Sequence, residues 1–587
     1  MRSIWVPIAS GVALGSVCVA LLGRSIEFPR PFPDQVLLGI WLGLPLALPA
    51  WAWLGVRAVA RAAASALRGA PASGDVFVET LVVQAVALSG AGTVLDRVFG
   101  GRIHAFERVT HPWGWLASDL GRGALCVAVA IAIGIALRRL RAGSRALAGF
   151  AALALVFNLS AGGWRRTHRI DPPRAPLHQV VQRDATGMNV IVLGVDGAGW
   201  PILDRMVSEG KMPHLAEALA NGARATLIAE PPLYSPVSWT TLGTGRPPAE
   251  HGITSYARWD FPGCRAELPI RPDATWLYPL YAVAGGLVAT GLVDQGPVTA
   301  DLRRADELWE MVSAWGGSTL TLNWPVSYPP QASRGQVVSD AYFREWEWVW
   351  PQRARLSKPT VEPPALLPIV ERLTVPPERA DPEPLRAFGD FDEADWARLR
   401  AHQPNGEPLP MLAWDVAVDA NVFASARELG GERPPDLTLI KTALEDEVVH
   451  YFAPYRWPGS FDGVDLEHAQ RWGRVLDAHH RRLDDALAEL FGKADPHTVV
   501  MVISDHGYRF LRNSPLSEEA HDPAGVWVAL GGPVRRGVAG ADAVGYDFAP
   551  TVLYLLGYPV PAGLRGRVRT DLLEPAFVAA HPVRTGR

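Results

Sequence analysis

Cysteine is scarce in this 587-residue chain, and basic charge is not in excess. Only Cys18, Cys126 and Cys264 are present, and the first two lie in apolar runs where a small polarizable side chain packs well. So few cysteines exclude a disulfide framework as the organising device. With 56 Lys and Arg against 60 Asp and Glu, the chain lacks the cationic surplus needed to bind a nucleic-acid polymer. We therefore expect no nucleic-acid partner.

Charged residues are also rare in five long runs of the first third of the chain. Each run is long enough, at 1.5 Å per helical residue, to cross or nearly cross a hydrocarbon core about 30 Å thick. The runs cover residues 4–23, 36–56, 76–95, 120–137 and 146–163. They predict a membrane domain of about five transmembrane helices over residues 1–165, followed by a linker over residues 166–187. The alternative is that some runs are buried helices of a soluble domain.

The arginines in the short loops indicate an orientation for these spans. The loops at 57–68 and 138–145 share a side with the N-terminus and carry more arginine than the loops opposite. Because cytoplasmic loops are enriched in Lys and Arg, the chain is predicted to be a multi-pass protein of the cell membrane with an extracytoplasmic C-terminal domain. The arginines at 165–169 argue for the reverse orientation.

The pattern changes after residue 187, where short apolar runs alternate with amphipathic stretches. Residues 189–195 (NVIVLGV) and 498–504 (TVVMVIS) are typical of buried strands, and residues 468–491 have helical periodicity. This alternation predicts an α/β sandwich around a largely parallel sheet over residues 188–587. The Pro- and Trp-rich stretch at 257–435 is an insertion, either a lid or substrate-facing subdomain or an ordinary packed segment.

Acidic residues and histidines follow the apolar runs, where the carboxyl ends of parallel strands would gather them. Asp446 and His450 are four residues apart, so one helical turn would direct both at one ion. Three Asp and three His suit two metal ions, and carboxylate oxygens with imidazole nitrogens are good zinc ligands. The candidates are Asp196, Asp446, His450, Asp505, His506 and His521.

A serine and the motif that follows it complete the pattern. Ser235 precedes Thr-Gly-x-x-Pro-x-x-His-Gly at 244–252, between Asp196-Gly197 and the later Asp-x-x-x-His and Asp-His-Gly motifs. With these motifs in this order, the chain resembles the type I phosphodiesterase/nucleotide pyrophosphatase family of the alkaline phosphatase superfamily. The resemblance covers about 189–253 and 436–568, and it implies an alkaline-phosphatase-like αβα sandwich.

The resemblance also implies a role for each matched residue. Asp196, Ser235, Asp505 and His506 would surround one metal ion, and Asp446, His450 and His521 would bind the other; both ions are commonly zinc in this family. Ser235 would be the nucleophile and would form a phosphoseryl intermediate. Independently of the family, a metal lowers the pKa of a coordinated hydroxyl, and two ions can stabilise the attacking and leaving oxygens of an in-line displacement.

The sequence departs from its family at one position and contains several similar-looking residues. An Asn that helps to hold phosphoryl oxygens is replaced by Tyr256, so the resemblance does not extend to nucleotide specificity. A sulfatase is disfavoured because Pro236 follows Ser235 directly and the Cys/Ser-x-Pro-x-Arg sequence is absent. Ser238, Thr240 and Thr241 are alternative hydroxyls. We expect a structural role for His251 and solvated positions for Asp465, His468, His479 and His480.

These features together predict a membrane-anchored, two-metal phosphoester hydrolase, with phosphodiesters as the favoured class of substrate. Its partners would be the membrane and a phosphoester substrate, which could be a small molecule, a nucleotide or a lipid headgroup. One alternative is a transferase that moves a phospho-headgroup to lipid or glycan acceptors, because both enzymes share the chemistry up to the intermediate. The other alternative is a non-catalytic membrane scaffold.

Overall fold

The structure is a computed structural model in which most of the chain after residue 180 is described. Residues 257–296 belong to a different compact unit from the one formed by Pro173–Tyr256 and Pro297–Arg587. The described residues are 37–38, 40–42 and 181–586, without 263–267, 271–286, 289–290, 332–333, 345–355, 357, 402–406, 432, 514 and 516–519.

A ten-stranded sheet forms the centre of the second unit, in the order β14-β2-β13-β10-β1-β9-β6-β7-β8, with β15 beside β2. The five strands from β10 to β7 are parallel, while β13 and β8 run antiparallel to their neighbours. The strands are β1 (Asn189–Val195), β2 (Ala223–Ile228), β6 (Thr319–Leu322), β7 (Gly335–Val338), β8 (Val361–Glu362), β9 (Leu437–Thr442), β10 (Thr498–Ile503), β13 (Ala524–Leu530), β14 (Val538–Ala539) and β15 (Ala543–Val544).

The apolar sequences of the central strands explain their position. β1, β9 and β10 are buried along nearly their whole length, as expected of parallel strands covered on both faces. β1 pairs with β10 on one side, with Asn189 opposite Thr498, and with β9 on the other. The mixed α/β architecture and the largely parallel sheet predicted from the sequence are confirmed.

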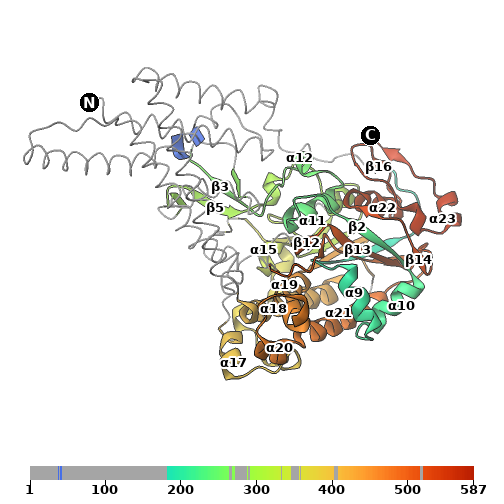
Figure 1. The fold of residues 1–587 in the computed structure, drawn as a ribbon. Coiled ribbons are helices and arrows are strands. Elements are labelled where there is room, and N and C mark those ends of the chain that lie inside the picture. Colours follow the sequence, from blue (N-terminus) through green and yellow to red (C-terminus); the bar gives the residue numbers. More distant parts are fainter. Residues whose placement is uncertain are drawn as a thin grey trace, which may run out of the picture. The chain divides into compact units, whose positions relative to one another are not determined.

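Helices cover both faces of this sheet (Figure 1). One face carries α11 (Ser235–Thr244), α14 (Leu308–Ala314) and α22 (Phe548–Leu555). The other carries α9 (Trp200–Ser208), α10 (Pro213–Asn221), α18 (Pro408–Gly430), α19 (Leu444–Arg456) and α21 (Val475–Phe491). Further α-helices of the described residues are α12 (Pro248–His251), α15 (Asp340–Phe343), α16 (Leu367–Leu373), α17 (Glu393–Leu399), α20 (Leu466–Trp472) and α23 (Pro575–Ala580).

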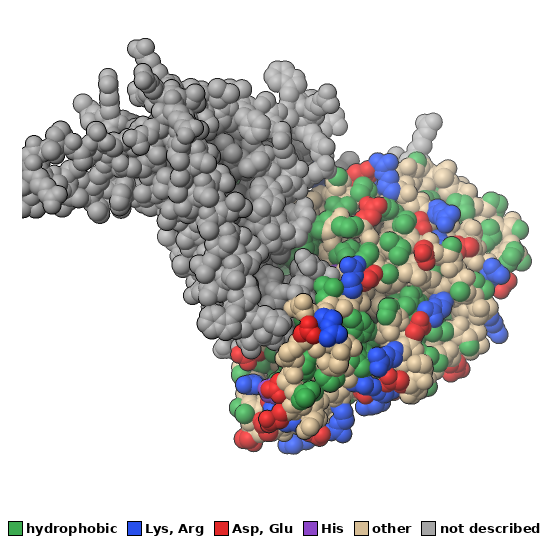
Figure 2. Space-filling model, in the orientation of Figure 1, with side chains coloured by type: hydrophobic (Ala, Val, Ile, Leu, Met, Phe, Trp, Pro, Cys, Tyr) green, Lys and Arg blue, Asp and Glu red, His purple; other side chains and the backbone are tan. Residues whose placement is uncertain are grey.

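Large aromatic side chains fill the core between the sheet and α11, α14 and α22. Trp239, Trp309 and Trp324 are fully buried there and meet edge to face, with ring centroids 5.0 Å and 6.5 Å apart. Such pairs add to the burial of apolar area. On the surface in Figure 2, Lys and Arg side chains are interspersed with Asp and Glu, in line with the balanced charge of the sequence.

Short strands form three further sheets. β3 (Ala257–Asp260) pairs antiparallel with β4 (Leu268–Ile270), and with β5 (Asp294–Pro297) they form a three-stranded sheet. In the second unit, β11 (Gly507–Tyr508) pairs with β12 (His521–Asp522), and β16 (Val560–Pro561) pairs with β17 (Thr585–Gly586).

Part of the predicted insertion at 257–435 belongs to the main sheet. β6, β7 and β8 extend the sheet beyond β9, and α14 packs against β6. Residues 257–296, in contrast, fall in the other compact unit.

The multi-span membrane region and the multi-pass localisation predicted from the sequence are wrong. Within the described part of the chain, no helix has the length and the apolar character of a membrane span. The prediction rested on apolar composition, which buried helices share with membrane spans. The five predicted runs themselves lie outside the described residues, apart from 37–38 and 40–42.

Candidate active site

The predicted site residues lie at the carboxyl ends of three neighbouring parallel strands. Asp196 follows β1, Asp505 and His506 follow β10, and β9 leads into α19, which carries Asp446 and His450. Parallel strands place these ends along one edge of the sheet, where ligands of α/β proteins bind. His521 joins them on β12.

Asp196 and Ser235 form the first contact in this site. Ser235 is the first residue of α11, and its Oγ donates a hydrogen bond of 3.2 Å to Oδ1 of Asp196. The side chains of both residues are buried. A helix N-terminus presents unpaired N–H groups, which favour a negatively charged group near Ser235.

The structure brings the predicted ligands into two overlapping groups. Asp196, Asp505 and His506 have donor atoms within 4.8 Å of one another, as do Asp446, His506 and His521. The rings of His506 and His521 are stacked, with centroids 4.1 Å apart. His506 thus belongs to both groups, whereas the family resemblance assigned it to one ion alone.

His450 lies next to these groups rather than within them. Its Nε2 is 3.3 Å from Oδ1 of Asp446, and its ring centroid is 5.0 Å from that of His521. Asp446 and His450 lie one turn apart on α19, so the predicted helical placement is confirmed. The assignment of all seven residues as ligands or nucleophile stays a prediction.

The three histidines share one hydrogen-bonding arrangement. Nδ1 of His450 lies 2.7 Å from the carbonyl oxygen of Pro515, Nδ1 of His506 lies 3.1 Å from that of Gly507, and Nδ1 of His521 lies 3.1 Å from that of Leu233. A carbonyl oxygen only accepts, so Nδ1 is the protonated nitrogen in each contact. Nε2 is then the nitrogen that can bind a metal, as in histidine ligands fixed by a partner on the other ring nitrogen.

Burial and mutual charge shift the pKa values of the site. Burial, with the charge of Asp196 added, raises the pKa of Asp505 well above its usual range. Burial disfavours protonation of His450, but Asp446 outweighs this and raises the pKa of His450 to about 9. Burial, assisted by His506, lowers the pKa of His521 well below its ordinary value. A bound cation would instead favour the ionised carboxylates and the neutral imidazoles, which are the forms that can act as ligands.

Gly197 allows Asp196 and Asp446 to approach each other. Its φ is +70°, and a Cβ built at this position would lie 2.4 Å from Oδ1 of Asp446. Any larger residue would therefore meet both backbone strain and a clash with a candidate ligand. The glycine after Asp196 is required by the packing of the site as well as by the turn.

Two residues of the site were missed by the sequence interpretation. Nζ of Lys441 lies 2.7 Å from Oδ2 of Asp196, and the indole N–H of Trp239 donates to the same oxygen at 3.4 Å. A signal for Lys441 was available, because it is the single charged residue of the buried strand β9 (LTLIKT). A charge in such a strand needs a partner.

The histidines outside the predicted ligand set fall into three cases: His251, His468, and the pair His479 and His480. His251 accepts from the backbone N–H of Ile253 at Nδ1 and contacts Thr241 Oγ1 at 3.0 Å, in keeping with a structural role. Asp465 caps α20 beside the partly exposed His468.

The expectation that His479 and His480 are solvated is wrong. Both are buried because α21 packs against α19, and their Nε2 atoms lie 2.7 Å and 3.2 Å from the two carboxylate oxygens of Glu445. Burial alone would raise the pKa of Glu445, but the two histidines outweigh it and lower this pKa to about 2. Glu445, which both histidines contact, directly precedes Asp446 on α19.

Comparison with known proteins identifies the family. The sequence profile of the type I phosphodiesterase/nucleotide pyrophosphatase family matches residues 190–530. The chain belongs to this family. The predicted family is therefore confirmed. No curated protein matches the chain.

Several solved structures resemble this family member at low identity. Phosphonoacetate hydrolase from Sinorhizobium meliloti is 19% identical (57% of this chain and 60% of that chain, TM-score 0.30). Phosphonate monoester hydrolase from Silicibacter pomeroyi is 14% identical (66% and 76%, TM-score 0.34). Murine ectonucleotide pyrophosphatase/phosphodiesterase 5 is 12% identical (66% and 100%, TM-score 0.34). The chain thus spans about 60% of the length of phosphonoacetate hydrolase, and the family assignment rests on the sequence match alone.

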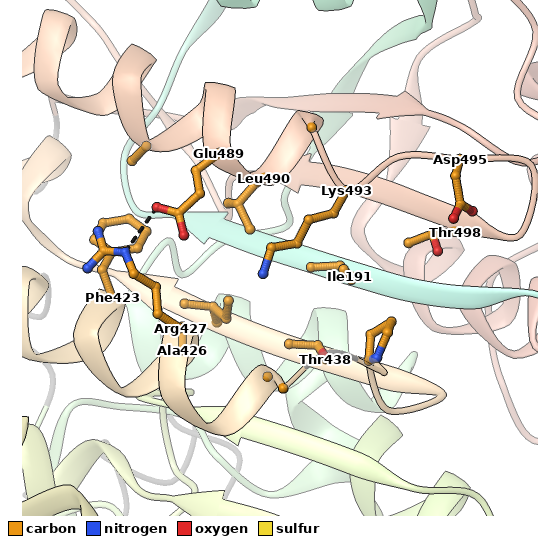
Figure 3. A pocket seen from close by; sticks show the side chains of 16 residues that line it. Ile191, Phe423, Ala426, Arg427, Thr438, Glu489, Leu490, Lys493, Asp495 and Thr498 are labelled. Carbon is orange, nitrogen blue, oxygen red and sulfur yellow. Dashed lines mark hydrogen bonds and ion pairs between the residues drawn. The ribbon is translucent and has the colours of Figure 1, made fainter.

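A separate cavity of about 320 Å³ lies at the opposite ends of the strands (Figure 3). Thr438 and Thr498, near the starts of β9 and β10, line it together with side chains of α18 and α21. An ion pair between Arg427 and Glu489, 3.0 Å long, crosses between these helices. The cavity contains none of the predicted site residues.

Proposed function

We propose that this chain is a phosphodiesterase that uses Ser235 as its nucleophile and binds two divalent ions, most suitably zinc. The observation that carries the proposal is the common arrangement of the three histidines, whose Nδ1 atoms all contact backbone carbonyls beside three buried or partly buried aspartates. A site of this kind has the donors of a two-ion centre within reach of one hydroxyl.

The residues present fit such ions. Among the buried polar atoms of the described residues, Oδ2 of Asp505 and Nε2 of His506 have no hydrogen-bond partner, which is costly unless something binds them. Asp196, Asp505 and His506 would hold one ion beside Ser235, and Asp446, His450 and His521 would hold the other. Carboxylates with imidazoles are typical zinc donors.

The residues of the chain divide the chemistry among them. Bound divalent ions would supply positive charge that lowers the pKa of a hydroxyl and stabilises phosphoryl oxygens. Asp196 orients the Ser235 hydroxyl, which then attacks phosphorus as the bond to the leaving alcohol breaks. The Ser235 proton ends on the leaving alcohol, and the seryl phosphodiester that remains is hydrolysed by water, which restores the hydroxyl and releases the phosphomonoester. The N-terminus of α11 favours the anionic phosphoryl group throughout.

The test is a combined measurement of metal content and turnover on the purified chain. We expect about two zinc ions per chain and hydrolysis of bis(p-nitrophenyl) phosphate that excess EDTA abolishes and added Zn²⁺ restores. Asp446→Ala and His521→Ala should each lower the zinc content. Full activity in a metal-free protein would refute the proposal, whereas a new phosphoester formed with an added alcohol would indicate a transferase.

A further inference from the structure

Lys441 is a buried cation in the middle of the main sheet. It lies on β9, opposite Gly194 of β1, and its side chain is fully buried. Since side chains alternate along a strand, Lys441 shares a face with Leu437 and Leu439, which pack in the core under α11. An ammonium group with no access to water requires a compensating charge.

The contacts of Asp196 separate its two carboxylate oxygens. Oδ2 contacts the Lys441 ammonium at 2.7 Å and the Trp239 indole at 3.4 Å. Oδ1 contacts Ser235 Oγ at 3.2 Å and lies 3.5 Å from Nε2 of His506. One oxygen is thus anchored on the sheet side, and the other points at the nucleophile and the histidine.

The packing of β1 supports this anchoring. A Cβ at Gly194 would lie 2.5 Å from the ring of Trp239, so the missing side chain leaves room for the indole that donates to Asp196. Lys441 is therefore held in a site built from β1, β9 and α11. Removing one partner of a buried ion pair strands the other, which is more costly than losing a pair at the surface.

We propose that Lys441 is a positioning residue that anchors Oδ2 of Asp196, leaves Oδ1 directed at Ser235 and His506, and compensates the carboxylate when divalent ions are absent. The proposal rests on the proposed metal-dependent function. With Lys441 removed, the charge of Asp196 has no ammonium partner in the metal-free protein, whereas a bound ion would supply a substitute. Loss of Lys441 should therefore destabilise the metal-free protein more than the loaded one.

The experiment compares Lys441→Met with the full-length wild-type chain by thermal unfolding in excess EDTA and in excess Zn²⁺. The matched control is Lys211→Met, which removes another lysine that is ion-paired, with Asp477 and Glu209, but lies outside the site. In EDTA we expect the Tm of Lys441→Met to fall by about 3 °C or more below that of the control. The rise in Tm caused by Zn²⁺ should be larger in Lys441→Met than in wild type and unchanged in Lys211→Met.

A double variant tests the pairing without metal. In EDTA, Lys441→Met/Asp196→Asn should be more stable than Lys441→Met alone, because the uncompensated carboxylate has been removed. An equally unstable double variant, or an equal Zn²⁺-induced rise in Lys441→Met and wild type, would overturn the role of Lys441 alone. A wild-type chain whose Tm does not respond to Zn²⁺ and that binds no zinc would overturn the proposed function and this role together.

Discussion

At the scale of the residue, Ser235 gives the sharpest prediction. Ser235→Ala removes the hydroxyl that contacts Asp196 but leaves the aspartates and histidines in place. We expect turnover of bis(p-nitrophenyl) phosphate to fall by several orders of magnitude, as when other catalytic nucleophiles are deleted. Zinc content, measured by elemental analysis, should be largely retained.

Ser238→Ala is the control for this prediction. Ser238 lies one turn further along α11 and is buried, but its Oγ has no hydrogen-bond partner among the described residues. Its loss should cost much less activity. Near-wild-type turnover in Ser235→Ala, or a trapped phosphoenzyme with the label on Ser238, would assign the nucleophile elsewhere.

His251 predicts a pH dependence of stability. Burial, with Arg303 and Arg304 nearby, lowers its pKa to about 3 from an ordinary value of 6.5. Between these two pH values the unfolded chain binds a proton at His251 that the folded chain does not. The neutral His251 therefore costs the fold no stability above about pH 6.5, and stability is lost as the pH falls from there toward about 3.

The measurement is urea unfolding of wild type and His251→Gln at neutral pH and at about pH 5. Wild type should lose about 2 kcal/mol more stability than His251→Gln over this interval. Equal losses in the two proteins would mean that His251 does not remain neutral in the fold.

The residues that the sequence revealed are those whose chemistry shows in short motifs. Asp196 and Asp505 stand beside a glycine and a histidine at strand ends, and Asp446 stands four residues before His450; such pairs can be recognised without a structure. Lys441 and Glu445 were missed because their partners come from distant segments. Lys441 contacts Asp196 directly after β1, and Glu445 contacts His479 on α21. Burial of His479 and His480 likewise depends on how two helices pack.

At the scale of the element, the turn after β1 gives a prediction with a built-in control. Gly197 and Gly210 have almost the same φ, +70° and +71°, but a Cβ at Gly197 would collide with Asp446 and one at Gly210 would meet nothing within 4 Å. Gly210→Ala should cost about 1 kcal/mol, the strain of a left-handed alanine. Gly197→Ala should cost clearly more.

Gly197→Ala should also impair the site, because the added methyl would push α19 and Asp446 away from Asp196. We expect reduced turnover and reduced zinc content in this variant and wild-type values in Gly210→Ala. Equal stability and activity of the two variants would show that the turn can relax without moving Asp446.

Helix boundaries were less predictable than strand centres. The periodic stretch at 468–491 suggested one helix, but the structure breaks it into α20 and α21 around Gly473. A Cβ at Gly473 would lie 2.5 Å from the carbonyl oxygen of Ala469, so the chain changes direction where only glycine fits. Hydrophobic periodicity continues across the break because Trp472 before it and Val475 and Leu476 after it are all buried.

At the scale of the whole molecule, the parallel sheet could be predicted from the sequence, whereas the prediction of a membrane region was wrong. The strand at 189–195 is apolar throughout and ends in an acid, a pattern that belongs to buried parallel strands. Apolar composition in the first third of the chain does not separate membrane spans from buried helices. The order of ten strands could not be predicted either, because pairings such as β9 with β6 join segments more than a hundred residues apart in the sequence.

The site links segments that are distant along the chain, which predicts that metal binding stabilises the whole second unit. The turn after β1, helix α11, helix α19 and the β10–β12 region each contribute at least one residue. Ions that bind the folded chain alone shift the unfolding equilibrium toward it. With free zinc at about a thousand times its Kd, the gain is about 4 kcal/mol for one site. Chemical unfolding of wild type with Zn²⁺ and with EDTA measures this difference.

Two variants make this last prediction specific. Asp446→Ala should lose the part of the zinc-dependent gain that comes from one of the two ions, since it removes a carboxylate from the group with His506 and His521. Asp465→Ala removes the aspartate of an Asp-x-x-His sequence that lies outside the site and caps α20 at the surface. This variant should keep the full gain although its stability falls slightly in both conditions. A gain that is equal in wild type and Asp446→Ala would place the stabilising zinc outside the group of Asp446, His506 and His521, because an ion can stabilise the fold only through residues that it binds there.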